Sequence, residues 1–153
     1  MKTWKQQIEQ TYELQRSKKW NKLYWIIDLH DTIISGTHNK FNEGAILYPY
    51  AKQTLDYLYD HEIHQTILWT SSHDDAIDDI LNRFDLRFNY LHNNPECPST
   101  ELCNFNRKLY FNFILDDKAL FDPVNDWYEI LSTLHMLDLG TYDFISEENE
   151  QQK

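Results

Sequence analysis

Apolar residues along the chain follow two alternating kinds of spacing. Continuous apolar runs rich in β-branched and aromatic residues predict buried strands over 23–28, 65–72 and 111–115, and a shorter strand over 87–91. Between them, apolar positions recur at helical spacing over 3–19, 49–61, 72–84 and 123–137. Strands that alternate with helices are typical of a parallel sheet with right-handed crossovers. The pattern therefore predicts an α/β fold, a three-layer sandwich around a central parallel sheet.

Three stretches lack a clear period. Residues 34–48 are rich in turn-forming Gly, Asn and Ser, which predicts a hairpin or flap too short to be a second domain. Residues 92–105 contain Pro and several Asn and predict a loop, whereas 142–145 predict a weak strand or coil. We therefore expect an N-terminal amphipathic helix within 1–22, one core domain over 23–146, and a polar, disordered tail at 147–153.

Composition narrows the class of protein. The chain has 153 residues, enough for one domain with a full core, and a formal net charge of −11. This charge argues against a general nucleic-acid surface, although it leaves room for a local basic site. Cys97 and Cys103 lack the spacing of metal ligands, so we expect reduced thiols in a cytoplasmic protein. No apolar run is long enough to span a membrane, so we expect no membrane association.

Candidate chemistry gathers where the strongest predicted strands end. One strand ends at Asp28, the second in Thr70 and Ser71, and the third in Asp116 and Asp117. The carboxyl ends of parallel strands share one edge of a sheet, where ligands of such folds bind. We therefore expect these acids and hydroxyls to converge, although they lie far apart in the sequence.

Residues 23–122 resemble the haloacid dehalogenase (HAD) superfamily of phosphatases. The first motif of that family is an apolar strand followed by Asp-x-Asp-x-Thr, and here the chain has Asp28, Leu29, His30, Asp31 and Thr32. The nucleophile position and the Thr match, and His30 stands where the family has its second acid. Thr70 matches the second motif, and Asp116-Asp117 after an apolar strand matches the fourth. Lys108, eight residues before Asp116, has the spacing of the motif lysine.

The resemblance implies a HAD core without a cap domain, and a Mg²⁺-dependent phosphomonoester hydrolase. The Asp28 carboxylate, the His30 backbone carbonyl and the Asp117 carboxylate would hold the cation, with Asp116 as an outer or partial ligand. Asp28 would attack phosphorus to form an aspartyl-phosphate. Thr70, Ser71 and a lysine would hold the phosphate oxygens, where charge spreads in the transition state.

Several roles stay open at this point. His30 is either the general acid and base, or a residue that only caps its loop, in which case Asp31 is another candidate for proton transfer. Lys108 and Lys118 are rival phosphate-binding lysines. The alternative function is an HAD-like protein that binds phosphate or a protein partner with weak or no catalysis. Both small and macromolecular phosphorylated substrates fit the resemblance, and it specifies no oligomeric state.

Overall fold

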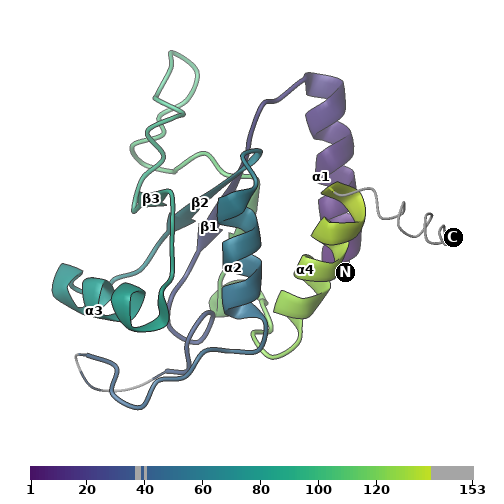
Figure 1. Cartoon of the computed structure of the whole chain (residues 1–153). Coiled ribbons are helices and arrows are strands. Elements are labelled where there is room, and N and C mark those ends of the chain that lie inside the picture. Colours follow the sequence, from purple (N-terminus) through teal and green to yellow (C-terminus); the bar gives the residue numbers. More distant parts are fainter. Residues whose placement is uncertain (37–38, 40, 139–153) are drawn as a thin grey trace, which may run out of the picture.

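A parallel sheet forms the centre of the molecule (Figure 1). The computed structural model describes all residues except 37, 38, 40 and 139–153. Within the described residues, four strands pair in the order β3-β2-β1-β4, and all pairs are parallel. The strands are β1 (Leu23–Ile27), β2 (His64–Leu68), β3 (Tyr90–Leu91) and β4 (Phe113–Leu115). The α/β fold with a central parallel sheet is therefore confirmed.

The helices pack on one face of this sheet. They are α1 (Trp4–Lys18), α2 (Ala51–Asp60), α3 (Asp74–Phe84) and α4 (Asp126–Asp138), and a short 3-10 helix follows β4 at Asp117–Ala119. Each of the four helices contributes buried side chains to the core that contains Leu23, Trp25 and Ile27 of β1. None of these helices is long and apolar enough to cross a membrane.

The opposite face of β1 meets the long connection between β3 and β4. Side chains alternate along a strand, so Tyr24 points away from the core that holds Trp25. The Tyr24 ring packs edge-on against Tyr110 at 5.9 Å, and its hydroxyl donates to Glu96. Residues 92–112 contain no helix and no strand. A loop, rather than a helix, thus covers this side of Tyr24.

Helix α1 is fixed to the domain by its ends and by one face. Thr3 and Gln6 form a reciprocal capping box at its start, which satisfies two backbone donors. Ile8 and Tyr12 are buried in the core. The Trp4 indole donates to Asp126 at the start of α4, with 3.0 Å between Nε1 and Oδ2. The amphipathic helix expected over 3–19 therefore packs as part of the core domain.

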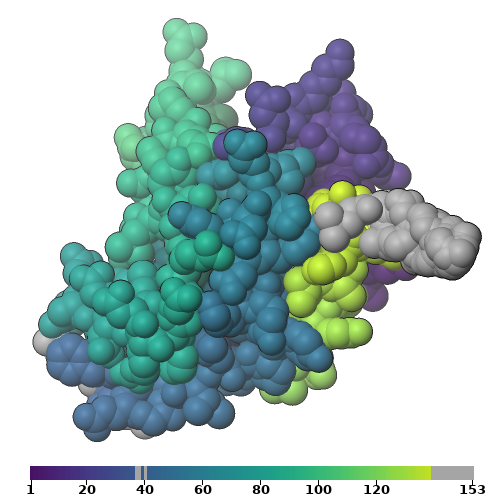
Figure 2. Space-filling view, in the orientation of Figure 1, coloured from purple at the N-terminus to yellow at the C-terminus, as the bar shows by residue number. Residues whose placement is uncertain are grey.

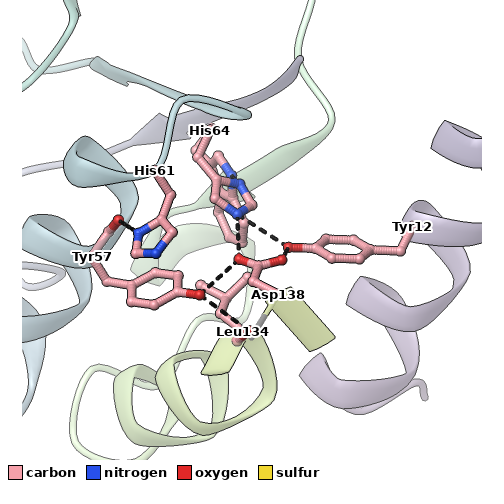
Figure 3. Close-up of polar contacts among 7 residues, drawn as sticks. Tyr12, Tyr57, His61, His64, Leu134 and Asp138 are labelled. Atoms are coloured by element: carbon pink, nitrogen blue, oxygen red, sulfur yellow. Dashed lines mark hydrogen bonds and ion pairs between the residues drawn. The ribbon is translucent and has the colours of Figure 1, made fainter. Parts of the chain in front are cut away.

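A buried polar cluster ties this helix to α2, α4 and the sheet (Figure 3). Asp138 accepts hydrogen bonds from Tyr12, from the Tyr57 hydroxyl at 2.9 Å, and from His64 Nε2 at 3.0 Å. The indole of Trp25 donates to His64 Nδ1 at 3.1 Å. An indole only donates, so Nδ1 carries no proton, and His64 is the neutral tautomer with its proton on Nε2.

The cluster is a structural one, because its polar atoms are already paired. Burial alone would raise the pKa of Asp138, but the hydrogen bonds from His64, Tyr12 and Tyr57 lower it overall. Burial, followed by the Asp138 charge, raises the pKa of both tyrosines. His64 is fully buried, which removes it from contact with any solvent-borne ligand.

Some element boundaries differ from those expected. Helix α4 begins at Asp126 instead of 123, because the Asp122 side chain accepts from Val124 N and closes a turn there. Strand β3 has two residues instead of the five expected over 87–91. His73, instead of Ser72, takes the N-cap position of α3. The weak strand expected at 142–145 and the tail at 147–153 lie outside the described residues.

Candidate active site

Three carboxylates meet at the edge of the sheet where β1 and β4 end. Asp28 directly follows β1, and Asp116 and Asp117 directly follow β4. Ile27 pairs with Leu115, and Asp28 N donates to Leu115 O at 2.9 Å, so the two strands end level with each other. Oxygen atoms of the three acids lie within 4.8 Å of one another. The strand order reverses between β1 and β4, which is the place where open α/β sheets bind ligands.

The buried Thr32 side chain lies next to Asp28 and Asp117 and connects them. Its side chain is fully buried, and its hydroxyl accepts from Asp117 N at 3.1 Å. The same hydroxyl lies 3.3 Å from Asp28 Oδ2 and 3.5 Å from Asp117 Oδ1, so it can donate its one proton to either carboxylate. The Thr32 carbonyl in turn accepts from the indole of Trp127 at 2.8 Å. The sequence pattern contained this Thr but gave it no role.

Electrostatics at this edge favour a cation. Burial, together with the charges of Asp116 and Asp117, raises the pKa of Asp28 to about 6. Within the described part of the chain, no Lys or Arg forms an ion pair with any of the three acids. Clustered oxygen donors with unbalanced negative charge fit a hard divalent cation such as Mg²⁺. The donor set present therefore suits the metal that the sequence resemblance implies.

His30 is held by the segment 34–48, which folds back on the motif. Its Nε2 lies 2.6 Å from Oδ1 of Asn42, a nearly fully buried residue. An amide oxygen only accepts, so Nε2 carries a proton and Nδ1 is the atom left for other partners. Arg83 of α3 donates to the carbonyl oxygens of Phe41 and Asn42 at 2.6 and 3.0 Å. Phe41 and Asn42 are thereby fastened to α3, and Ile34 forms an antiparallel bridge with Leu47 where the two ends of the segment meet.

Asp31 is engaged within its own loop. Its backbone φ is +59°, and its Oδ1 accepts from Gly36 N at 2.8 Å. A Cβ on Gly36 would lie 2.5 Å from that oxygen, so a larger residue here would displace the Asp31 carboxylate. The Asp31 carboxylate thus closes the turn that starts the flap.

The hydroxyl residues after β2 reach the same edge of the sheet. Trp69 N donates to Ile27 O at 2.8 Å, which brings Thr70 beside the loop that follows β1. The Thr70 hydroxyl accepts from Ser72 N at 3.2 Å and lies 3.3 Å from Ser72 Oγ. Ser71 is exposed at this turn.

The two candidate lysines lie in different places. Lys118 is exposed in the 3-10 helix Asp117–Ala119, and its backbone N donates to Asp116 Oδ1 at 2.9 Å. Lys108 lies in the loop before β4, beside Phe105 and Tyr110, and Asn112 N donates to Tyr24 O near the start of β1. Asp116 follows the other end of β4. The structure therefore does not bring Lys108 to the acids, and Lys118 is the lysine that adjoins them.

Tyr48 adds a further group that sequence reasoning missed. Burial and the nearby charges of Asp31 and Asp117 raise the pKa of its hydroxyl. Its backbone N donates to Ile33 O at 3.0 Å, which places it where the flap returns to the core. Neither Tyr48 nor Asn42 belongs to a sequence motif. Both reach the site only because the flap folds back, so the sequence did not indicate them.

Comparisons with known proteins bear on the fold alone. No family model matches the chain, and no curated protein matches it. The structure of a conserved protein from Bacteroides thetaiotaomicron is similar, with a TM-score of 0.54 and 23% sequence identity. The match covers 78% of this chain and 92% of that one. At this identity the likeness supports the α/β architecture.

Proposed function

We propose that the protein is a Mg²⁺-dependent phosphomonoester hydrolase of the HAD type. The observation that carries this proposal is the cluster of Asp28, Asp116 and Asp117 at the switch point, without a paired Lys or Arg among the described residues. Asp28, Asp117 and the His30 carbonyl would hold the cation, with Asp116 beside them. When bound, the cation neutralises charge between the phosphate and the carboxylates and so lowers the barrier to nucleophilic attack.

The residues of the chain divide the remaining tasks. A carboxylate oxygen of Asp28 attacks phosphorus, and the bond from phosphorus to the leaving oxygen breaks as the aspartyl-phosphate forms. His30 gives its proton to the leaving oxygen, then accepts a proton from the water that hydrolyses the acyl phosphate. Thr70, Ser71 and Lys118 hold the phosphate oxygens. Because Cys97 and Cys103 are free thiols, we assign this activity to the cytoplasm.

A second candidate function is phosphate or partner binding with weak catalysis. The short contact of His30 with Asn42 favours it, because Nε2 is already engaged and only Nδ1 remains for proton transfer. Both functions predict that beryllium fluoride, a mimic of the phosphoryl group, binds in line with the Asp28 carboxylate. Only the first predicts turnover.

The deciding experiment is hydrolysis of a generic aryl phosphate by the purified chain, with Mg²⁺ and with a chelator. Turnover that requires Mg²⁺ and disappears in Asp28→Asn supports the hydrolase. Asp122→Asn is the matched control, because Asp122 is an exposed acid in the turn before α4. Beryllium fluoride binding without turnover would select the second function. If the double variant Asp28→Asn, Asp117→Asn still binds Mg²⁺ normally by calorimetry, the cation site is elsewhere and the proposed hydrolase mechanism fails.

A further inference from the structure

A second feature lies at the opposite end of the sheet from the acids. Trp20, Lys22 and Tyr24 line one side of a hollow of about 490 Å³, and Glu96 and Tyr110 line the other. Figure 2 shows the corresponding notch between the end of α1, in purple, and the loop 92–112, in green. Lys22 precedes β1 and Asp28 follows it, so the hollow and the acids are separated by about 20 Å along the strand.

Cationic side chains concentrate at this end in an otherwise acidic protein. Arg16, Lys18, Lys19 and Lys22 fall within seven residues that contain no acid, and the chain has 14 Lys and Arg in total. Arg107 and Lys108 come from the facing loop, where Lys108 lines an adjoining hollow that also includes Tyr110. In the part of the chain that the structure describes, none of these six forms an ion pair, whereas Lys52, Arg83 and Arg87 are paired with Asp. Their positive charge is therefore available to a ligand.

Aromatic rings accompany these charges in a fixed arrangement. The Tyr110 ring is held edge-on by Tyr24 at 5.9 Å and by Phe105 at 5.7 Å. The Trp20 backbone is tied to α1 by hydrogen bonds to and from Gln15. Glu96, the acid that lines the hollow, already accepts from the hydroxyls of Tyr24 and Tyr90. The Tyr110 ring is therefore held in place, and the partly buried Trp20 packs against the core while it also lines the hollow. Aromatic side chains beside unpaired cations match a ligand that has both flat bases and phosphates.

We propose that this hollow binds a short segment of single-stranded nucleic acid. Bases stack on the rings of Trp20 and Tyr110, and Lys22, Lys108 and the cations of 16–19 contact successive phosphates. The adjoining hollow at Lys108 extends the site beyond a single nucleotide, which favours a strand over a mononucleotide. An acidic peptide would use the cations but would leave the rings without a stacking partner.

Fluorescence anisotropy with a labelled short oligothymidylate tests the proposal on the full chain. Affinity should fall as salt rises from about 50 to 200 mM, with a log–log slope of about −0.7 for each phosphate contact. Lys108 is exposed, and Lys108→Gln combined with Lys22→Gln should weaken binding and make this slope shallower by about 1 to 2. Trp20→Ala should weaken binding by about 5- to 100-fold through lost stacking. Lys5→Gln, on α1 away from the hollow, is the matched control and should change nothing.

Three outcomes would overturn the proposal. The first is no binding at low salt, and the second is unchanged binding in the double variant of Lys22→Gln with Lys108→Gln. The third is equal competition by a short oligoglutamate, which would identify a general polyanion surface. The lysine variants keep the test valid if Trp20→Ala unfolds the protein. The proposal is independent of the hydrolase, because Asp28→Asn should abolish hydrolysis while it leaves oligonucleotide binding intact.

Discussion

The Thr32 hydroxyl accepts a hydrogen bond from the backbone N–H of Asp117, 85 residues later in the chain, at 3.1 Å. Thr32→Val keeps the shape of the side chain but leaves that N–H without its acceptor. We expect a loss of about 1–3 kcal/mol in the free energy of unfolding, measured by urea titration, together with weaker Mg²⁺ binding. Thr32→Ser keeps the hydroxyl and should preserve Mg²⁺ binding, while the loss of its buried methyl should cost about 1 kcal/mol. Equal stability and Mg²⁺ affinity in Thr32→Val and the parent would show that this contact is unimportant.

Asp28 should make the metal-free protein less stable as pH rises. Its folded pKa is about 6, above the ordinary value of 3.8, so the folded state binds the extra proton between those two values. Stability from this group is therefore present at low pH and lost as pH rises toward 6 and beyond. Near neutral pH, Asp28→Asn should stabilise the metal-free protein by about 1–2 kcal/mol, with allowance for solvent screening at this half-buried position.

The measurement is urea unfolding in the presence of a chelator across this pH range. Asp122→Asn is the control of opposite sign, because hydrogen bonds from the Asn125 side chain and Val124 N lower the pKa of Asp122. Stability of Asp28→Asn below that of the parent near neutral pH would contradict the expected repulsion.

Asp138 should make the protein less stable as pH falls, the reverse of the effect of Asp28. Its pKa is lowered in the folded state, so its contribution is present above the unfolded pKa and is lost as pH falls through the folded one. Asp138→Ala removes the acceptor of three buried donors and should cost about 2–4 kcal/mol near neutral pH. The difference from the parent should shrink in acid. Asp78→Ala, an exposed acid on α3, should cost little, and similar losses in both variants would argue against the buried cluster.

His30→Ala tests the proposed proton transfer. Loss of a general acid should slow hydrolysis of alkyl phosphates by about 10²–10⁴-fold, whereas aryl phosphates, whose leaving groups need little protonation, should suffer less. Mg²⁺ affinity should persist, because only the backbone carbonyl is assigned to the cation. The quantity to compare is the ratio of alkyl to aryl turnover in variant and parent. An unchanged ratio in an active parent would exclude His30 as the acid.

Arg83 should control the flap. Its guanidinium donates to the carbonyls of Phe41 and Asn42, so Arg83→Ala should increase amide hydrogen exchange across residues 41–48. Arg87→Ala is a matched control, because Arg87 pairs with Asp56 and Asp60 instead. Equal exchange of the flap in both variants would show that Arg83 does not fasten it.

The convergence of the acids could be predicted because topology alone determines it. Parallel strands bring their carboxyl ends to one edge, so Asp28, Thr70 and Asp116 needed no knowledge of side-chain packing. The position of Lys108 was less predictable. Its spacing from Asp116 is that of the motif lysine, but the chain turns at 105–107 and enters β4 at the end away from the acids. Sequence spacing carries no information about where an irregular loop runs.

Contacts made across the fold gave no sequence signal. Asn42 reaches His30 only because the flap folds back, and its own hydrogen bonds determine that path. The cluster of Asp138 with His64 joins residues that are 74 positions apart, and they lie just outside the helix expected over 123–137 and the strand expected over 65–72. The apolar pattern of the sequence does not show which buried polar residues pair with each other.

The pairing of β1 with β4 also determines when the acidic cluster can form during synthesis. Asp28 cannot meet Asp117 until the ribosome has released β4, which is the strand that pairs with this side of β1 in the described part of the chain. A nascent chain that ends after β3 carries an unfilled edge on its central strand, which is open to pairing with strands of other molecules. Such a fragment also lacks two of the three carboxylates, so it has no charge cluster to attract a cation. With the cation site proposed above, affinity for a divalent cation would report that the last strand has docked.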